Sequence, residues 1–161
     1  MRIRKELAMR GKHRDYVRIE GAALLIMAAA MVIPLILALF YGEKSSVIGF
    51  GTVIGFCFLA GVLIRIIIKP SPEKFKSRDG FFVVSLTWFV CSLAGAAPFL
   101  ISGSIPDLAD AVFESCAGFS TTGASILTDI ESMPKSILFW RSFTHWLGGM
   151  GVLVFLLALA P

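Results

Sequence analysis

A short hydroxyl-rich run lies between two strongly apolar segments of the chain: Gly118-Phe119-Ser120-Thr121-Thr122-Gly123-Ala124. Such a hydroxyl-rich run cannot face lipid, because its backbone N–H and C=O groups would go unpaired in hydrocarbon. It offers a close row of carbonyl and hydroxyl oxygens, and Gly123 permits backbone angles that a side chain would forbid. These are the requirements for replacing the hydration shell of a small cation. The segment Ser120–Ala124 therefore predicts an ion selectivity filter.

The composition around this run is that of a polytopic membrane protein. Of 161 residues, 57% are hydrophobic and only 16% are charged, which is too apolar for a soluble domain of this size. Four apolar segments are long enough to cross a hydrocarbon layer of about 30 Å at about 1.5 Å per residue. We therefore expect an all-α fold of several transmembrane helices in a lipid bilayer. The four segments are Val17–Tyr41, Ser46–Ile68, Phe81–Ile101 and Ser136–Ala160.

The basic residues follow the predicted membrane topology. They gather before the first span and between the second and third spans, whereas the segment from Ser102 to Lys135 is acidic. By the positive-inside bias, the N-terminus and the Lys69–Arg78 loop are cytoplasmic and the acidic segment faces outward. The formal net charge of +4 forms no binding stripe, so we expect no nucleic-acid partner. Lipid or partner binding is the alternative to topology control for these clusters. The basic residues are Arg2, Arg4, Lys5, Arg10, Lys12, Arg14, Arg18, Arg65, Lys69, Lys74, Lys76 and Arg78.

The chain divides into two predicted parts. Residues 1–70 comprise a basic cytoplasmic N-terminus and a two-helix transmembrane hairpin, which is closed by Gly42-Glu43-Lys44-Ser45. Residues 81–161 comprise a helix, a pore loop and a second helix. The prolines of Lys69-Pro70-Ser71-Pro72 break the helix between the two parts.

We predict structural roles for several residues within the spans. Pro34 and Pro98 are expected to kink their helices or to mark an end. Gly51 and Gly55 fit a close helix-packing face, with the ordinary tolerance of glycine in membrane helices as the alternative. The three cysteines show no metal-ligand spacing, so we expect them to pack as small hydrophobic side chains without disulfides. They are Cys57, Cys91 and Cys116.

A half-length helix is predicted after Pro106. Asp107 is its expected N-cap, Asp110 opposes the positive end of the helix dipole, and Gly118 suits the C-terminal cap. A helix of about 12 residues reaches about 18 Å, which is too short to cross the membrane and long enough to reach its middle. Residues 124–133 can then return the chain to the outer surface. We predict a re-entrant pore helix and loop, with an interfacial amphipathic helix as the alternative.

Two ionisable residues lie on one face of the last span. Arg141 and His145 are four residues apart, and ionisable groups within a span indicate a function by default. We expect Arg141 to reach outward or to bond carbonyls and acids of the re-entrant segment, with direct ion gating as the alternative. His145 is expected to pack with one nitrogen bonded. An enzyme would need Ser120 or Ser125 as nucleophile with His145 as base, but no GxSG elbow is present, so we predict no enzyme.

Three blocks of sequence, the first of which contains the predicted filter, match a known family pattern. They are Ala111–Ala124, Leu138-Phe139-Trp140-Arg141 and Trp146-Leu147-Gly148-Gly149-Met150-Gly151. Together they resemble the first pore repeat of the Trk/Ktr potassium-uptake family, specifically its TrkH-type membrane subunit, and the preceding hairpin resembles the extra N-terminal helices of such members. In that family four helix–pore loop–helix units surround one pore. The resemblance implies that carbonyls around Thr121, Thr122 and Gly123 bind potassium in one quarter of a filter.

The resemblance also implies a role and partners. The role is potassium transport across the cell membrane, with potassium as the transported substrate and no cofactor. The implied partners are the remaining pore repeats, a second copy in a homodimer and a cytoplasmic nucleotide-binding regulatory subunit. Because the sequence stops at Pro161 after one repeat, we expect a fragment of a longer product; a non-transporting remnant or accessory membrane subunit is the alternative. The residues expected to support the pore helix are Asp107, Asp110, Glu114, Gly118, Arg141, Gly148 and Gly149, the last two in a small-residue patch that continues to Gly151.

Overall fold

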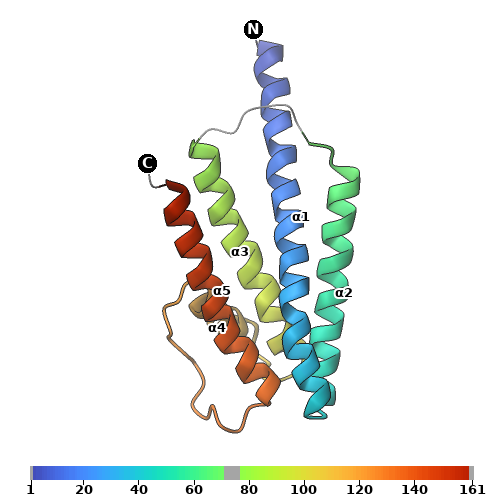
Figure 1. Ribbon diagram of the computed structural model, residues 1–161, viewed down its shortest axis with the longest axis vertical. Coiled ribbons are helices and arrows are strands. Elements are labelled where there is room, and N and C mark those ends of the chain that lie inside the picture. Colours follow the sequence, from blue (N-terminus) through green and yellow to red (C-terminus); the bar gives the residue numbers. More distant parts are fainter. Residues whose placement is uncertain (1, 71–76, 160–161) are drawn as a thin grey trace.

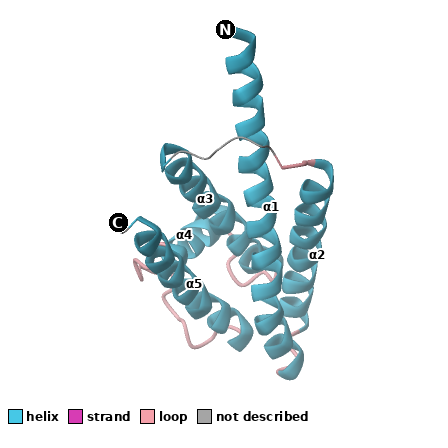
Figure 2. Ribbon diagram, turned by 45° about the horizontal axis from the view of Figure 1, so that its top comes forward, coloured by secondary structure: helices cyan, strands magenta, loops and turns pink. Residues whose placement is uncertain are grey.

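The protein is a bundle of helices in this computed structural model (Figure 1). The structure describes the backbone of residues 2–70 and 77–159, and the side chains of residues 13–70 and 79–153. Within these ranges Figure 2 shows helices and loops and no strand. The long helices run along the bundle axis, and the short α4 lies behind α5 at mid-height (Figure 1). The helices are α1 (Arg2–Phe40), α2 (Lys44–Ile67), α3 (Ser77–Ile101), α4 (Leu108–Phe119) and α5 (Lys135–Leu159).

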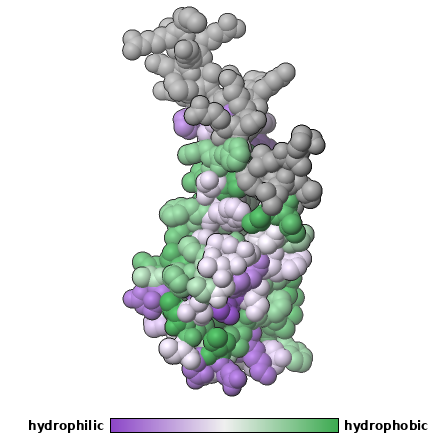
Figure 3. All heavy atoms as spheres, turned by 90° about the vertical axis from the view of Figure 1, so that its left-hand side faces the viewer, coloured by the Kyte–Doolittle hydropathy of each residue, from purple (hydrophilic) through white to green (hydrophobic). Residues whose placement is uncertain are grey.

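Three helices of the described part are long and apolar enough to cross a membrane, namely His13–Phe40 within α1, Lys44–Ile67 and Asp79–Ile101. Helix α5 has 25 residues, which is also the length of a crossing. Figure 3 shows a largely hydrophobic surface on the side of the bundle at the left of Figure 1, with hydrophilic and near-neutral residues at mid-height and at the lower end. The predicted all-α, multi-pass architecture is confirmed.

Two helices begin before the apolar spans predicted within them. Helix α1 begins at Arg2 instead of Val17, because the basic segment is rich in good helix formers and contains no proline. Helix α2 begins at Lys44, because Gly42 adopts φ +70° and completes the turn early. The structure does not describe several positions used in the topology prediction. They are the side chains of Arg2, Arg4, Lys5, Arg10, Lys12 and Arg78, together with Ser71, Pro72, Lys74, Lys76, Ala160 and Pro161.

The structure tests the roles predicted for prolines and glycines within the spans. Pro34 and Pro98 lie inside α1 and α3, so neither marks a helix end. The packing face proposed for Gly51 and Gly55 is wrong within this chain, since a Cβ at either position would meet no described atom within 4 Å. The close approach of α1 and α2 lies instead at Gly61, where a Cβ would come within 2.7 Å of the Gly21 carbonyl oxygen.

Polar side chains of the α1–α2 hairpin form hydrogen bonds at both ends of the bundle. Glu43, in the α1–α2 turn, accepts hydrogen bonds from the N–H groups of Lys135 (2.7 Å) and Ser136 (3.2 Å) and from the Ser136 hydroxyl. At the other end, Arg14 donates to the Lys69 carbonyl (3.0 Å) and Arg18 donates to the Ile68 carbonyl (3.2 Å). These two arginines therefore satisfy carbonyls at the C-terminal end of α2, besides any influence on topology.

The core sits where the hairpin meets α3 and α5. Trp140 of α5 is fully buried, packs edge-on against Phe50 of α2 at 6.1 Å between ring centroids, and donates from Nε1 to the Gly95 carbonyl of α3 at 3.0 Å. The indole N–H is thus satisfied inside an apolar core. Phe99 and Met31 complete this fully buried cluster. The core fixes α5 against α2 and α3, and so fixes the wall against which α4 packs.

Candidate ion-filter site

The short helix α4 starts where its capping residues predict. The Asp107 carboxylate Oδ1 accepts hydrogen bonds from the N–H groups of Ala109 (2.8 Å) and Asp110 (3.1 Å). Asp110 lies in the first turn, where its charge opposes the positive end of the helix dipole. The predicted N-cap is confirmed, and the helix has 12 residues.

The end of α4 differs from the prediction. Gly118 is not the C-terminal cap, because the helix continues to Phe119 and Ser120 takes the cap position. The chain then turns back on the helix: the Thr121 N–H donates to the Gly118 carbonyl (2.9 Å) and the Thr122 N–H to the Ala117 carbonyl (3.0 Å). The last carbonyls of α4 are therefore satisfied by the first residues of the predicted filter.

The predicted filter segment is an exposed, non-helical stretch with unusual backbone angles. Thr121 adopts φ +57° and Gly123 adopts φ +76°. The left-handed region is open to glycine and unfavourable for a β-branched residue such as threonine. All residues from Ser120 to Ser125 are exposed. The Ser120 and Thr122 hydroxyls bond each other at 2.8 Å, which places these side chains on one side of the turn.

Glycines of three different helices let α4 sit close to its neighbours. A Cβ at Gly148 of α5 would lie 2.7 Å from the Phe119 carbonyl carbon, and a Cβ at Gly95 of α3 would lie 2.7 Å from the Ser115 hydroxyl. Gly118, of α4 itself, packs against Thr144 of α5 without room for a side chain. The predicted small-residue contact is confirmed for Gly148. At Gly149 and Gly151 an added Cβ would make only ordinary contacts, at 3.8 and 3.9 Å.

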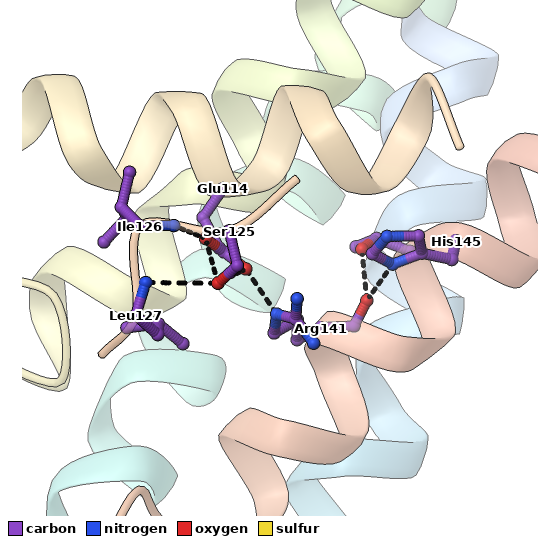
Figure 4. A network of polar contacts seen from close by, with 7 residues as sticks. Glu114, Ser125, Ile126, Leu127, Arg141 and His145 are labelled. Carbon is purple, nitrogen blue, oxygen red and sulfur yellow. Dashed lines mark hydrogen bonds and ion pairs between the residues drawn. The ribbon is translucent and has the colours of Figure 1, made fainter. Parts of the chain in front are cut away.

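A buried carboxylate links α4 to the segment that follows the predicted filter (Figure 4). Glu114 accepts hydrogen bonds from the Ser125 hydroxyl, at 3.0 and 3.1 Å to its two oxygens, and from the Ile126 N–H at 3.1 Å. Arg141 of α5 forms an ion pair with the same carboxylate through Nε. The Glu114 side chain is fully buried and that of Arg141 is 19% exposed. Figure 4 shows Glu114, Ser125 and Arg141 pointing toward one another from three separate segments.

The expected contacts of Arg141 and His145 are present. Arg141 bonds an acid of the re-entrant segment, and His145 Nδ1 lies 2.9 Å from the Arg141 carbonyl oxygen, so one imidazole nitrogen is bonded. The hydroxyl of Ser125 donates to Glu114 and then accepts from the Leu127 N–H at 3.1 Å. The structure therefore joins Ser125 to the carboxylate and not to His145, contrary to a serine–histidine catalytic pair.

Neither the cysteines nor the acidic side chains form a metal centre in the described part. Cys57 is buried and Cys91 is half-buried, as expected of small hydrophobic side chains, but Cys116 is exposed, so the packing prediction is wrong for it. No group of three histidine, cysteine or acidic side chains lies close enough to hold an ion among the described residues.

A family model for the cation transport protein TrkH matches residues 48–161. The chain belongs to the TrkH family. Its TrkH relatives include the Trk system potassium uptake protein TrkH of Vibrio parahaemolyticus, 37% identical over 150 residues, and that of Escherichia coli, 36% identical over 154 residues. Each alignment covers 92% of this chain. The crystal structure of the potassium transporter TrkH from Vibrio parahaemolyticus matches with a TM-score of 0.84 at 36% identity, over 91% of this chain.

The chain spans less than one third of the TrkH relatives that it matches: 30% and 31% of the two uptake proteins and 31% of the crystallised chain. The match supports a fragment, as expected from the single repeat. Sequence reasoning missed three residues of the site: Gly95, Ser125 as a partner of Glu114, and Ile126. The run Ala94-Gly95-Ala96-Ala97 was an available signal for a close helix contact.

Proposed function

We propose that this TrkH-family chain is the N-terminal part of a potassium-transporting subunit, with Ser120–Ala124 as one side of the selectivity filter. Carbonyl oxygens of Thr121, Thr122 and Gly123 would replace part of the hydration shell of potassium. The observation that carries the proposal is the exposed stretch with left-handed backbone at Thr121 and Gly123, held directly against the C-terminal end of α4. The negative end of the α4 dipole favours a cation at this place.

The chain spans less than one third of its TrkH relatives, so the proposed transporter includes parts beyond this chain. Residues 1–70 would form a cytoplasmic basic segment and an accessory hairpin, and residues 81–161 would form the first of four pore repeats. The exposed residues Ser120–Ser125 would then face the other three repeats across the pore. A homodimer and a cytoplasmic nucleotide-binding regulatory subunit complete the proposed assembly in the cell membrane.

Growth of a potassium-uptake-deficient bacterium on limiting potassium tests this function. We expect rescue by a four-repeat form, in which this chain is followed by three further repeats, and none by residues 1–161 alone, because one re-entrant loop supplies one side of a coordination cage. Rescue by the short form at equal membrane abundance would overturn the fragment interpretation. Failure of the four-repeat form at normal abundance would favour a non-transporting subunit.

The proposed orientation has a cytoplasmic N-terminus and an external loop after α3. It rests on the basic residues near the N-terminus and around Lys69 and on the acidic outer segment. Single cysteines placed at Lys74 and Gly103 can be tested with a membrane-impermeant thiol reagent on intact cells, in a background where Cys116 is replaced by serine. We expect labelling at Gly103 and protection at Lys74, and the opposite pattern would reverse the topology.

A further inference from the structure

We propose that Glu114 determines the ion preference of the filter without touching the ion, by tethering the loop segment that follows the filter. The inference rests on the proposed function, since it concerns the filter segment. Glu114 is a positioning residue: its carboxylate contacts Ser125 and Ile126, which follow the predicted coordinating residues in the chain. The role differs from that of a residue that only supports the pore helix.

The filter segment is held at two ends. On the upstream side, the N–H groups of Thr121, Thr122 and Gly123 are bonded to carbonyls at the end of α4. On the downstream side, the Ser125 hydroxyl and the Ile126 N–H are bonded to Glu114, itself part of α4. Both anchors therefore belong to one rigid 12-residue helix. The carbonyls between them are fixed relative to α4 by the distance between the two anchors.

Few contacts hold the segment beyond the Gly123 N–H, which donates to the Ala117 carbonyl at 3.5 Å. A Cβ at Gly123 would meet no described atom within 4 Å, and the segment from Ser120 to Ser125 is exposed. Packing from the described part of the chain thus cannot set the direction of the Gly123 carbonyl. The tether at Ser125 lies two residues away and limits the backbone rotations that would turn this carbonyl.

The ion pair explains how a carboxylate can serve as the tether. A fully buried carboxylate is costly unless it is paired and hydrogen-bonded. Glu114 is paired with Arg141 and accepts hydrogen bonds from the Ser125 hydroxyl and the Ile126 N–H. Glutamine at position 114 would keep one acceptor oxygen, but its NH₂ group cannot accept from Arg141 or Ser125. Removal of Arg141 would leave the charge uncompensated and weaken folding, so Arg141 variants alone cannot separate the two roles.

The test is made in the four-repeat form by measuring rubidium and sodium uptake, each per molecule of protein in the membrane. We expect Glu114→Gln and Ser125→Ala to lower the ratio of rubidium to sodium uptake by about three- to tenfold, because each weakens hydrogen bonds of the tether. Glu131→Gln is the matched control: it makes the same chemical change at an exposed position of the same loop, and should keep the ratio. A double variant, Glu114→Gln with Arg141→Met, should accumulate better than Arg141→Met alone and keep the lowered ratio of Glu114→Gln.

Equal losses of rubidium and sodium uptake in Glu114→Gln and Ser125→Ala would overturn the tether, since a purely structural residue alters the amount of working protein and not the ratio. Should Glu114→Gln fail to accumulate, Ser125→Ala decides, because it leaves the carboxylate and its ion pair intact. An unchanged ratio in Ser125→Ala would then reject the inference. Absence of rubidium uptake by the unmodified four-repeat form would instead reject the proposed function, and the tether with it.

Discussion

The carboxylate of Glu43 stands at the N-cap position of α2, yet it accepts its hydrogen bonds from Lys135 and Ser136, the first two residues of α5. Glu43 makes no side-chain capping bond to its own helix. Helix α5 is preceded by Pro134, whose side chain carries no acceptor, so its free N–H groups are satisfied by a residue of the α1–α2 turn. The turn between α1 and α2 thus caps helix α5.

Replacement of Glu43 should loosen the hairpin from the pore repeat. We expect Glu43→Ala to lower the free energy of unfolding by about 1–2 kcal/mol, through the loss of a cap and of a negative charge at a helix N-terminus. Glu43→Gln keeps acceptor oxygen and should lose less. The thermal midpoint of the four-repeat form in detergent measures the effect, with the exposed Ser45→Ala as control. Equal midpoints for Glu43→Ala and Ser45→Ala would contradict a capping role.

Alanine at Gly148 should displace the end of α4. Its Cβ would lie 2.7 Å from the Phe119 carbonyl carbon and 2.9 Å from the Phe119 Cα, and these backbone atoms cannot rotate away. We expect a loss of about 1–3 kcal/mol in stability from such overpacking. Gly51→Ala is the control, since a Cβ there meets open space and alanine favours a helix. The yield of monodisperse protein should fall for Gly148→Ala and hold for Gly51→Ala; equal yields would remove the close contact.

The left-handed angle at Gly123 should be required for selectivity. Serine at this position must adopt φ +76°, at a cost of about 1–2 kcal/mol, or turn the carbonyl away. We therefore expect Gly123→Ser to reduce the preference for potassium over sodium in the four-repeat form. Gly103→Ser is a matched control, because Gly103 has φ +73°, equally open surroundings and a place outside the filter. If both variants had the same permeability ratio, Gly123 would not belong to the filter.

The buried carboxyl group of Glu20 should be dispensable as an acid. Glu20 lies within the His13–Phe40 span, is 7% exposed and accepts a hydrogen bond from the Thr87 hydroxyl at 2.8 Å. Its second oxygen has no hydrogen-bond partner within the described residues. Glu20→Gln keeps the acceptor for Thr87 and cannot ionise, so its thermal midpoint should equal or exceed that of the unmodified protein. Glu20→Ala leaves the hydroxyl without its acceptor and should lower the midpoint. A drop of equal size for glutamine would show that the ionised form is needed.

The helices could be predicted from the sequence where one local property decides them. Span length and hydropathy predicted the membrane helices, and the acceptor side chain of Asp107 predicted the start of α4. The end of α4 could not be predicted in this way, because Gly118 serves a contact with Thr144 of another helix instead of a cap. A glycine near a helix end has two physical uses, and the sequence alone does not separate them.

The contacts of the site depend on how the helices are rotated and placed against each other. Arg141 was expected to reach outward or to bond carbonyls and acids of the re-entrant segment, because it lies near the outer end of its span. The structure shows that the acid is Glu114 and that Ser125 also bonds it. These contacts depend on the path of the loop after Ala124, which has no hydropathy pattern of its own. The bond between Glu43 and Lys135 joins residues 92 positions apart, and only the packed bundle brings them together.

Threonine at position 121 has a dynamic consequence. Glycine would adopt φ +57° without cost, but it would also reach many other backbone states of similar energy. Threonine pays about 1–2 kcal/mol for this angle and has fewer alternatives, so the ordered segment loses less conformational entropy when it becomes fixed. The first turn of the proposed filter thus combines a strained backbone angle with few alternative backbone states. In the proposed filter, a backbone with few alternative states would leave its oxygens little freedom to adapt to ions of different radius.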